Sequence, residues 1–249
     1  MKERGGLAGD RVPGRRAVRE LFVAGKRHVQ TVWIARGQDA NPLLDEIAEL
    51  AAASGTTIRL VEADRVRSES RIEAPQGVVA VAAPIQAVAL GDLTARPDAF
   101  LVALDGVTDP RNLGAVLRVA ESAGVTGVVL ARHRAASLSP AAVKAAAGAV
   151  EHLPIAVVGG IPGALEQMSR AGVWTVGLDA DGATSVYDLA VADGPVALVF
   201  GAEGRGLSRL ATVRCDVLAA IPRHGHVESL NVSTAAAVAC FEVARRRAR

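Results

Sequence analysis

Aromatic residues are scarce in this chain. Phe, Trp and Tyr make up 3% of its 249 residues, although half of the residues are hydrophobic. A core built from these residues must consist mainly of Ala, Val and Leu. No uninterrupted run of about 18 apolar residues occurs, so we expect no membrane span. The basic N-terminus is not followed by an apolar stretch, which argues against a secretory signal.

Cysteine is almost absent as well. Cys215 and Cys240 are far apart in the sequence and form no CxxC pair. This pattern is typical of reduced, mostly buried thiols in a cytoplasmic protein. His224 and His226 lie in a polar loop, but no cluster of His and Cys has the spacing of metal ligands. We therefore expect no metal site.

Charge is nearly balanced overall but unevenly distributed. The formal net charge is +2, yet residues 1–36 contain nine Lys and Arg against three acidic residues. The last eight residues contain four Arg and one Glu. Clustered positive charge at both ends favours a polyanion as partner, and RNA is the obvious candidate. The alternative is that these charges only keep the ends of the chain soluble.

The hydrophobic pattern predicts two domains of the α/β class. Residues 1–11 are basic, rich in Gly and without periodicity, so we expect them to be flexible. Residues 12–83 have an α-β-α-β-β pattern, and residues 84–97 are punctuated by Gly91 and Pro97 like a linker. Residues 98–249 alternate Val- and Leu-rich strands with helices, which predicts a parallel sheet covered on both faces. Ligands of such sheets bind beyond the carboxyl ends of the strands, here the loops after Leu104, Leu178, Phe200 and Ile221.

The first of these loops, LDGVTDPRNLG at residues 104–114, leads into a helix. Asp109, Pro110 and Asn112 are typical of a helix start. Arg118 follows within a helix that is otherwise small and apolar, and this favours a functional role. An ion pair of Arg118 with Glu121 on the protein surface is the alternative.

The second loop, VFGAEGRGL at residues 199–207, has its glycines in a GxxGxG spacing. This is neither the GxGxxG of dinucleotide-binding proteins nor a phosphate-binding P-loop, which would need Gly-Lys-Ser/Thr. Glycines allow a ligand to approach the backbone closely. The carboxylate of Glu203 suits a cationic or hydroxyl-bearing ligand better than a phosphate. A plain tight turn is the alternative.

The third loop ends in SLNVS at residues 229–233, just before an Ala-rich helix. Ser229, Asn231, Ser233 and Thr234 supply more capping groups than one helix start needs. The surplus indicates a binding site, although a simple cap behind a polar loop is the alternative. Backbone groups at Ile221 and Leu230 could line a slot for an adenine.

Taken together, three segments resemble the SpoU (TrmH-like) family of RNA 2′-O-ribose methyltransferases in the SPOUT superfamily. The segments are LDGVTDPRNLGAVLRVAESAG, ALVFGAEGRGLS and IPRHGHVESLNVSTAAAVACFE. In addition, GRRAVRELFVAG and APQGVVA are similar to the small substrate-binding domain of one branch of the family. That branch methylates a guanosine in the large-subunit (23S) rRNA. The resemblance extends over nearly the whole chain from about Val12.

The resemblance implies a fold that the pattern alone does not predict. Residues 98–249 would form a SPOUT α/β domain with a deep trefoil knot, and residues 12–83 an L30e/L7Ae-like RNA-binding domain. Chain connections almost never form knots, so only the resemblance supports this feature. It also implies a homodimer whose active site lies next to the subunit interface.

The resemblance also implies the reaction, which is S-adenosylmethionine-dependent methylation of a guanosine 2′-OH in large-subunit rRNA. A tRNA ribose methyltransferase, an antibiotic-resistance rRNA methyltransferase and a non-catalytic ribosome assembly factor are the alternatives. The implied catalytic residues are Asn112, Arg118, Glu203, Ser229 and Asn231. The implied cofactor contacts are backbone groups at Leu178, Gly201, Ile221 and Leu230.

Arg118 would act on the 2′-OH in one of two ways. It is either the proton acceptor or a cation that stabilises the developing alkoxide. A guanidinium in water is protonated and offers no acceptor, so the first role would need strong desolvation.

Contacts with RNA phosphates are expected from the N-terminal domain, where shape and backbone recognition should dominate because aromatic side chains are rare. The candidate contacts with RNA are Arg15, Arg16, Arg19, Lys26, Arg27 and His28.

Glu228 precedes Ser229 and adds negative charge, with no assigned role.

Overall fold

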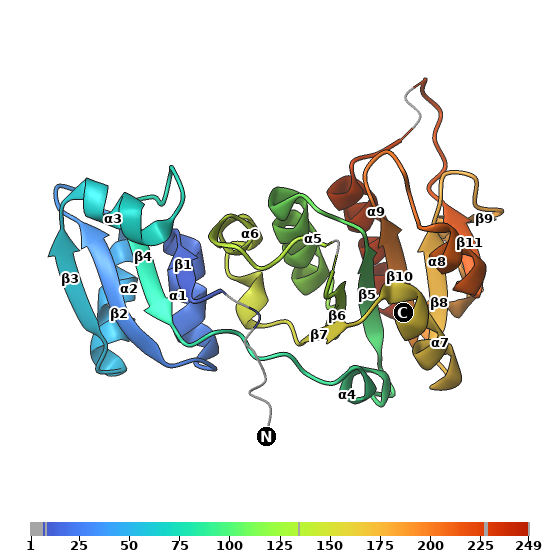
Figure 1. Cartoon of the computed structure of the whole chain (residues 1–249), viewed down its shortest axis with the longest axis horizontal. Helices are drawn as coiled ribbons and strands as arrows, with labels where there is room; N and C mark the ends of the chain where they lie inside the picture. The colour runs from blue at the N-terminus through green and yellow to red at the C-terminus, as the bar shows by residue number, and fades with distance from the viewer. Residues whose placement is uncertain (1–6, 8, 134, 227–228, 249) are drawn as a thin grey trace. The chain divides into compact units, whose positions relative to one another are not determined.

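The computed structural model describes residue 7 and residues 9–133, 135–226 and 229–248, and the chain divides into two compact units (Figure 1). Unit 1 comprises the chain up to Gln86 together with Ser137–His152, and unit 2 comprises Ala87–Ala136 and the chain from Leu153 onward. The division expected from the sequence counted residues 137–152 with 98–249. The domain bounds 12–83 and 98–249 stay a prediction.

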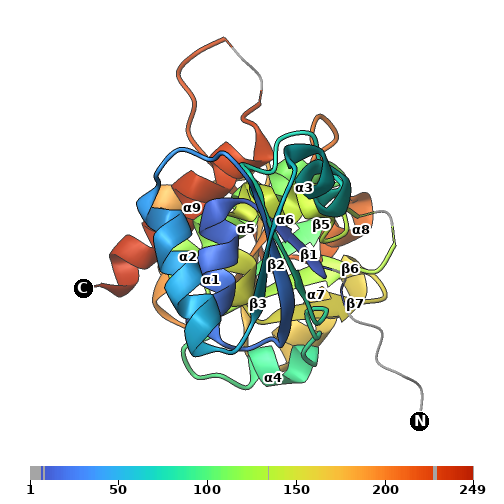
Figure 2. The same ribbon diagram turned by 90° about the vertical axis from the view of Figure 1, so that its left-hand side faces the viewer.

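Unit 1 is built on a mixed four-stranded sheet with the strand order β1-β4-β2-β3. Only β2 and β3 run parallel to each other. Helices α1 and α2 lie on one side of the sheet and α3 lies on the other (Figure 2). The small α/β fold expected for the N-terminal part is confirmed. The elements are β1 Arg11–Pro13, α1 Arg15–Ala24, β2 Val29–Ala35, α2 Pro42–Ala53, β3 Thr57–Val61, α3 Ala63–Ser70 and β4 Val78–Ala82.

The segment 137–152 joins unit 1 through buried ionic contacts. It forms α6 (Pro140–Ala146) and the 3₁₀ helix η1 (Ala149–Glu151). Arg27 Nη1 lies 2.6 Å from Glu151 Oε1, and only 7% and 1% of these side chains are exposed. Arg27 also donates hydrogen bonds to the carbonyl oxygens of Gly9 and Ala83. A buried charge is tolerated only when it is paired and hydrogen-bonded, so this contact fixes the segment.

Unit 2 contains a seven-stranded sheet in which every pairing is parallel, with the order β7-β6-β5-β10-β8-β11-β9. The parallel sheet expected from the sequence is confirmed. Its strands are β5 Phe100–Asp105, β6 Gly127–Ala131, β7 Ile155–Val158, β8 Trp174–Leu178, β9 Thr184–Ser185, β10 Val196–Gly201 and β11 Val217–Ala220.

Helices cover both faces of this sheet. Leu101 and Ala103 of β5 pack in a core cluster with residues of α4, α7 and α8. Since successive strand residues point to opposite faces, Phe100, Val102 and Leu104 face the other side, where α5 and α9 pack against each other. Burial on both faces explains the continuous apolar run of β5. The helices are α4 Leu90–Thr94, α5 Pro110–Ser122, α7 Ile161–Arg170, α8 Arg209–Arg214 and α9 Val232–Arg247, with two 3₁₀ helices, η2 Val186–Asp188 and η3 Ala190–Asp193.

The expected linker 84–97 contains structure of its own. Helix α4 lies within it, and Leu90 and Leu93 are buried in the core of unit 2. The knot implied by the resemblance stays a prediction. Among the residues that the structure describes, no helix is both long and apolar enough to cross a membrane.

Candidate active site

The candidate site lies at the carboxyl edge of the unit 2 sheet, where α5 and α9 begin. Both helices start with a side chain that caps the first turn. Asp109 Oδ1 accepts a hydrogen bond from the backbone N–H of Arg111 at 2.8 Å. Asn231 Oδ1 accepts one from the backbone N–H of Ser233 at 2.8 Å. These caps fix the starts of α5 and α9, and the two helix starts place Asn112 and Asn231 at the same edge of the sheet.

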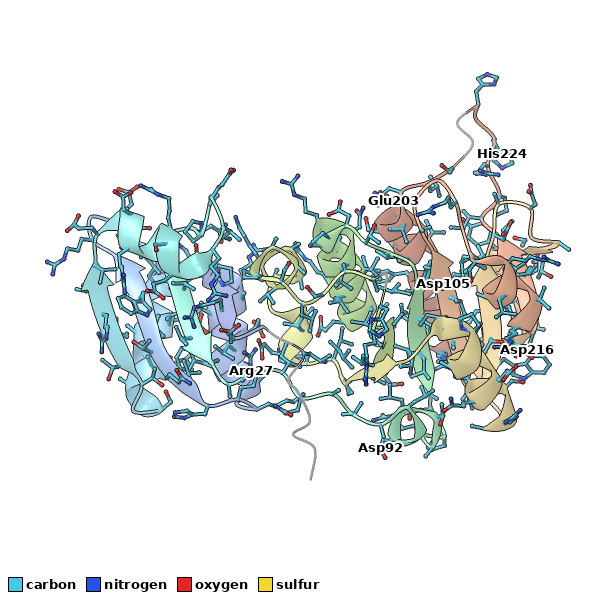
Figure 3. All side chains as sticks on the ribbon, viewed as in Figure 1. Arg27, Asp92, Asp105, Glu203, Asp216 and His224 are labelled. Atoms are coloured by element: carbon cyan, nitrogen blue, oxygen red, sulfur yellow. The ribbon has the colours of Figure 1, made fainter. Side chains whose placement is uncertain are left out.

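Three loops that are far apart in the sequence meet in one hydrogen-bond network. Asn231 Nδ2 donates to Glu203 Oε1 at 3.1 Å and to Asn112 Oδ1 at 3.1 Å. Asn112 Nδ2 also donates to Glu203 Oε1, and to Asp109 Oδ2 at 3.3 Å. The carboxylate of Glu203 therefore accepts from both amides. Figure 3 shows Glu203 at the end of the sheet from which the His224 loop rises.

A cavity of about 730 Å³ adjoins this network, and Glu203 belongs to both. The four positions expected to contact the cofactor, Leu178, Gly201, Ile221 and Leu230, all line it. Ser229 lines it too. The volume lies within the range of about 300–1,000 Å³ that is typical of small-molecule sites. The structure thus brings the expected cofactor positions together.

The glycine loop closes one wall of the cavity. Ala202 and Gly206 exchange backbone hydrogen bonds of 2.9 and 2.8 Å. A Cβ at Gly201 would collide with the backbone of Gly206, and Gly206 itself has a φ of 64°. Only glycine satisfies both demands without strain. The GxxGxG spacing is therefore needed for the tight loop that presents Glu203.

The residues at this cavity fit S-adenosylmethionine. The cofactor carries a cationic sulfonium and an ammonium group, and the carboxylates of Asp179, Asp181 and Glu203 line the cavity. The sequence indicated the loop after Leu178 but did not single out Asp179 and Asp181. Their position directly after a buried strand could have identified them as candidate binding residues.

Comparison with protein families agrees with this geometry. Residues 99–241 match the SpoU rRNA Methylase family, and residues 11–88 match the RNA 2′-O ribose methyltransferase substrate-binding family. The chain belongs to the SpoU rRNA methylase family. The first match contains Asn112, Glu203 and Asn231, and the second contains most of unit 1.

Similar proteins match over nearly their full lengths. The chain is 39% identical to the 23S rRNA (guanosine-2′-O-)-methyltransferase RlmB of Pseudomonas aeruginosa, over 96% of this chain and 97% of that protein. It is 43% identical to RlmB of a Burkholderia species, over 88% and 89%. The structure resembles the crystal structure of the SpoU methyltransferase AviRb from Streptomyces viridochromogenes in complex with AdoMet, with a TM-score of 0.78, 29% identity and coverage of 96% and 90%.

Two of the expected catalytic residues stand apart from the network of this SpoU family member. Arg118 is exposed on α5, and no hydrogen bond or ion pair of its side chain is found among the described residues, including Glu121. Arg118 lies six residues after Asn112, which corresponds to about 9 Å along the axis of α5. Ser229 is exposed at the cavity without a hydrogen bond to the network. Glu228 lies outside the described residues.

The six basic residues expected to contact RNA are in different situations. Arg27 is buried with Glu151, and Arg19 Nε lies 2.8 and 2.9 Å from the two carboxylate oxygens of Glu46. The others have fewer internal contacts. Arg15 donates to Gln38 and to the Gln76 carbonyl oxygen, Lys26 donates to the His152 carbonyl oxygen at 3.3 Å, and Arg16 and His28 are exposed.

Possible metal ligands and the two thiols can be described within the same ranges. No group of three or more His, Cys, Asp or Glu side chains there could hold a metal ion. Burial raises the pKa of both Cys215 and Cys240 to about 12. Since the thiolate is the reactive form, neither cysteine is a nucleophile near neutral pH.

Proposed function

We propose that this protein uses S-adenosylmethionine to methylate the ribose 2′-OH of a guanosine in 23S rRNA. The observation that carries the proposal is the network of Asn112, Glu203 and Asn231 beside the cavity lined by Leu178, Gly201, Ile221 and Leu230. The RlmB proteins, which match the chain over nearly its whole length, support 23S rRNA as the substrate.

The cavity would hold the cofactor through backbone groups at Leu178, Gly201, Ile221 and Leu230. The bound cofactor supplies an activated methyl group. The remaining task for the protein is to orient the ribose and to handle one proton. Glu203 is fixed by two amide donors, so its second oxygen is free to accept a hydrogen bond from a ribose hydroxyl. Asn112 and Asn231 keep that carboxylate in place.

Arg118 and Ser229 complete the proposed site. Ser229 faces the cavity, and its hydroxyl would contact the target nucleotide. Arg118 is exposed and can approach bound RNA, where it would act on the 2′-OH as a proton acceptor or as a cation that stabilises the alkoxide. A lysine at this position keeps the charge and changes the basicity, so Arg118→Lys separates the two roles.

A homodimer is part of the proposal. Phe241 on α9 and Leu230 at the cavity rim are 50% and 42% exposed, although both are large and apolar. A second copy covering α9 would bury such side chains and bring its interface close to the site. The molecular mass in solution, measured by light scattering, tests this. The cytoplasmic location expected from the sequence belongs to the same proposal.

The test of the function is a map of ribose methylation on total RNA from cells with and without the gene. We expect one 23S rRNA guanosine to lose its 2′-O-methyl group in the deletion strain and to regain it on complementation. Complementation with the Glu203→Ala variant should fail. A modification missing from tRNA instead would contradict the rRNA assignment, and an unchanged map would contradict enzymatic activity.

The two roles of Asn231 can be separated by one substitution. Asn231→Asp keeps an oxygen that can cap α9, so a loss of stability would come from the contact with Glu203 and not from the cap. The new carboxylate replaces the amide donor beside Glu203, and like charges repel at that distance. We expect methyl transfer to fall about 100-fold or more.

Asn231→Ala is the companion variant, because it removes the cap as well as the donor. It should lose a similar amount of activity and about 1 kcal/mol of stability. Methyl transfer near the wild-type rate in Asn231→Asp would show that the network does not serve catalysis. Chemical denaturation and transfer of labelled methyl groups to rRNA measure the two effects.

A further inference from the structure

One face of the unit 1 sheet is only partly covered by a helix. Short helix α3 packs on this face through Val66, next to Ala35 and Val79. The strand register places Trp33 beside Arg59 of β3, and Thr31 beside Thr57 in the neighbouring row. Thr57 and Arg59 are exposed, and Thr31 and Trp33 are half-buried. We call the residues Thr31, Trp33, Thr57, Arg59 and Arg65 the Trp33 face.

Two guanidinium groups lie over the Trp33 ring. The Cζ of Arg59 lies 5.3 Å from the ring centroid, and the Cζ of Arg65 lies 5.0 Å from it. Both distances are within the range of cation–π interactions. Arg59 has no side-chain hydrogen bond or ion pair among the described residues, so its N–H groups stay available to other acceptors. Trp33 is one of only two Trp in a chain that has few aromatic residues.

The acidic residues around this face are already paired. Arg65 contacts Glu69 at 2.8 Å, Arg67 pairs with Asp64, and Arg36 lies 3.9 Å from Glu62. In contrast, Arg59 has no acidic partner within 4.0 Å among the described residues. The positive charge of Arg59 is therefore not balanced by a carboxylate, and its side chain is already held in place over Trp33. Such a pre-ordered arginine loses little conformational freedom when it binds an anion.

Arg19 on α1 and Arg27, which follows α1, offer less to an RNA than the exposed Arg16. The guanidinium of Arg27 is buried, and Arg19 is bound to both oxygens of Glu46. A phosphate contact would require these side chains to give up their existing partners. The Trp33 face needs no such rearrangement at Arg59.

We propose that the Trp33 face binds the phosphodiester backbone of the RNA substrate, with Arg59 as the phosphate contact and Trp33 as its positioning residue. The proposal rests on the proposed function, because it assigns this surface to the same RNA. The Thr57 hydroxyl supplies a neutral donor in the neighbouring row, whereas the Thr31 hydroxyl already donates to the Thr57 carbonyl oxygen at 3.1 Å. Arg and hydroxyl donors are the usual partners of phosphate oxygens.

The first test uses methylation kinetics with an unmodified 23S rRNA transcript. We expect Arg59→Glu to raise the KM for RNA at least 10-fold with little change in kcat and with an unchanged Tm. The plot of log affinity against log salt should become shallower by about 1 for each phosphate that the variant no longer binds. Arg59→Lys should fall between wild type and Arg59→Glu, because it keeps the charge but not the planar guanidinium, which can donate two parallel hydrogen bonds to a phosphate.

Two matched variants serve as controls, because each replaces another exposed arginine by glutamate. Arg170→Glu reverses an exposed arginine on α7 in unit 2 and should leave the KM for RNA within about 2-fold, a margin below 0.5 kcal/mol. Arg16→Glu reverses an exposed arginine on α1. If Arg16→Glu weakens RNA binding and Arg59→Glu does not, the RNA lies on α1 and the proposal is wrong.

A second test does not depend on methyl transfer. In a Trp174→Phe background, Trp33 is the only tryptophan and reports directly on its own surroundings. Titration with the same transcript should change the Trp33 emission, and Arg59→Glu should shift the titration to higher RNA concentration. An unchanged emission at saturating RNA would overturn the proposal. Absence of methyl transfer by the wild-type protein, with the emission change retained, would instead count against the proposed function alone.

Discussion

Replacing Arg118 by Ala is expected to reduce methyl transfer to rRNA about 100- to 1,000-fold while the fold and cofactor binding are retained. Arg118 is exposed on α5 and has no hydrogen bond or ion pair among the described residues. A surface substitution of this kind changes the free energy of unfolding by about 0.5 kcal/mol at most. A large loss of rate would therefore come from the reaction and not from the stability of the protein.

The control for this prediction is Glu121→Ala. Glu121 is exposed one turn further along α5, so its loss tests whether changing the charge of this helix is enough to impair the enzyme. Methyl transfer by Glu121→Ala should stay near the wild-type rate. Retained transfer in Arg118→Ala would remove Arg118 from the mechanism, and loss of cofactor binding would assign it to the cofactor.

Arg118→Lys separates the two possible roles of the guanidinium. A lysine keeps the positive charge, so electrostatic stabilisation predicts a partly active variant whose pH profile is flat until the lysine titrates at about pH 10. A proton acceptor of different basicity predicts a shifted pH profile. The pH dependence of kcat, measured at saturating RNA and cofactor, distinguishes these outcomes.

The edge of the sheet that carries the site could be predicted from hydrophobic patterning alone. Buried strands such as Phe100–Leu104 and Val196–Phe200 are continuous apolar runs, and parallel strands direct their following loops to one edge. The rule was enough to place Asn112, Glu203 and Asn231 at a common end. Their roles came only from the family resemblance. A sequence does not distinguish an asparagine that caps a helix from an asparagine that orients a carboxylate.

Helix α5 was less predictable. The sequence indicated a small, apolar helix with one arginine, but α5 is amphipathic and Arg118 lies on its exposed face. Small residues such as Ala115 and Val119 remain half-buried there, so the pattern overstates the burial. Composition reports how apolar a helix is on average, whereas exposure depends on what packs against each side.

The segment 137–152 could not be assigned from sequence for a different reason. Arg27 and Glu151 are separated by 124 positions, and ion pairs leave no periodic signal. His152 adds a contact of 2.8 Å to Glu20, again across most of the chain. For the same reason, the sequence counted Arg27 among the candidate contacts with RNA phosphates. Because the structure buries Arg27, we expect its replacement to cause a large loss of stability.

Arg27→Ala is expected to lower the free energy of unfolding by about 3–5 kcal/mol. The substitution leaves the Glu151 carboxylate, only 1% exposed, without its partner at 2.6 Å. It also removes the donors to the carbonyl oxygens of Gly9 and Ala83. A buried, unpaired charge is far more costly than the loss of a surface ion pair. Urea denaturation at pH 7 measures the effect, with Arg96→Ala as the exposed control.

The pH dependence of that loss identifies its cause. Burial raises the pKa of Glu151, while the nearby charges of Arg27, His152 and Lys26 act in the opposite direction. Without Arg27 the pKa should rise further, so the folded state binds the proton more tightly than the unfolded state. The penalty is then fully present above the folded pKa. It fades as the pH falls from the folded pKa of the variant to the folded pKa of the wild type.

The difference in stability between wild type and Arg27→Ala should therefore shrink as the pH falls from 7. Adding Glu151→Gln to Arg27→Ala removes the buried charge and should restore part of the stability at pH 7, with no further gain at low pH. If the loss is the same at every pH, its cause is the two unpaired carbonyl groups and not the carboxylate. Arg27→Met with Glu151→Leu replaces the pair by apolar side chains of similar size. It should come closest to wild type, because replacing a buried ion pair in this way is often neutral.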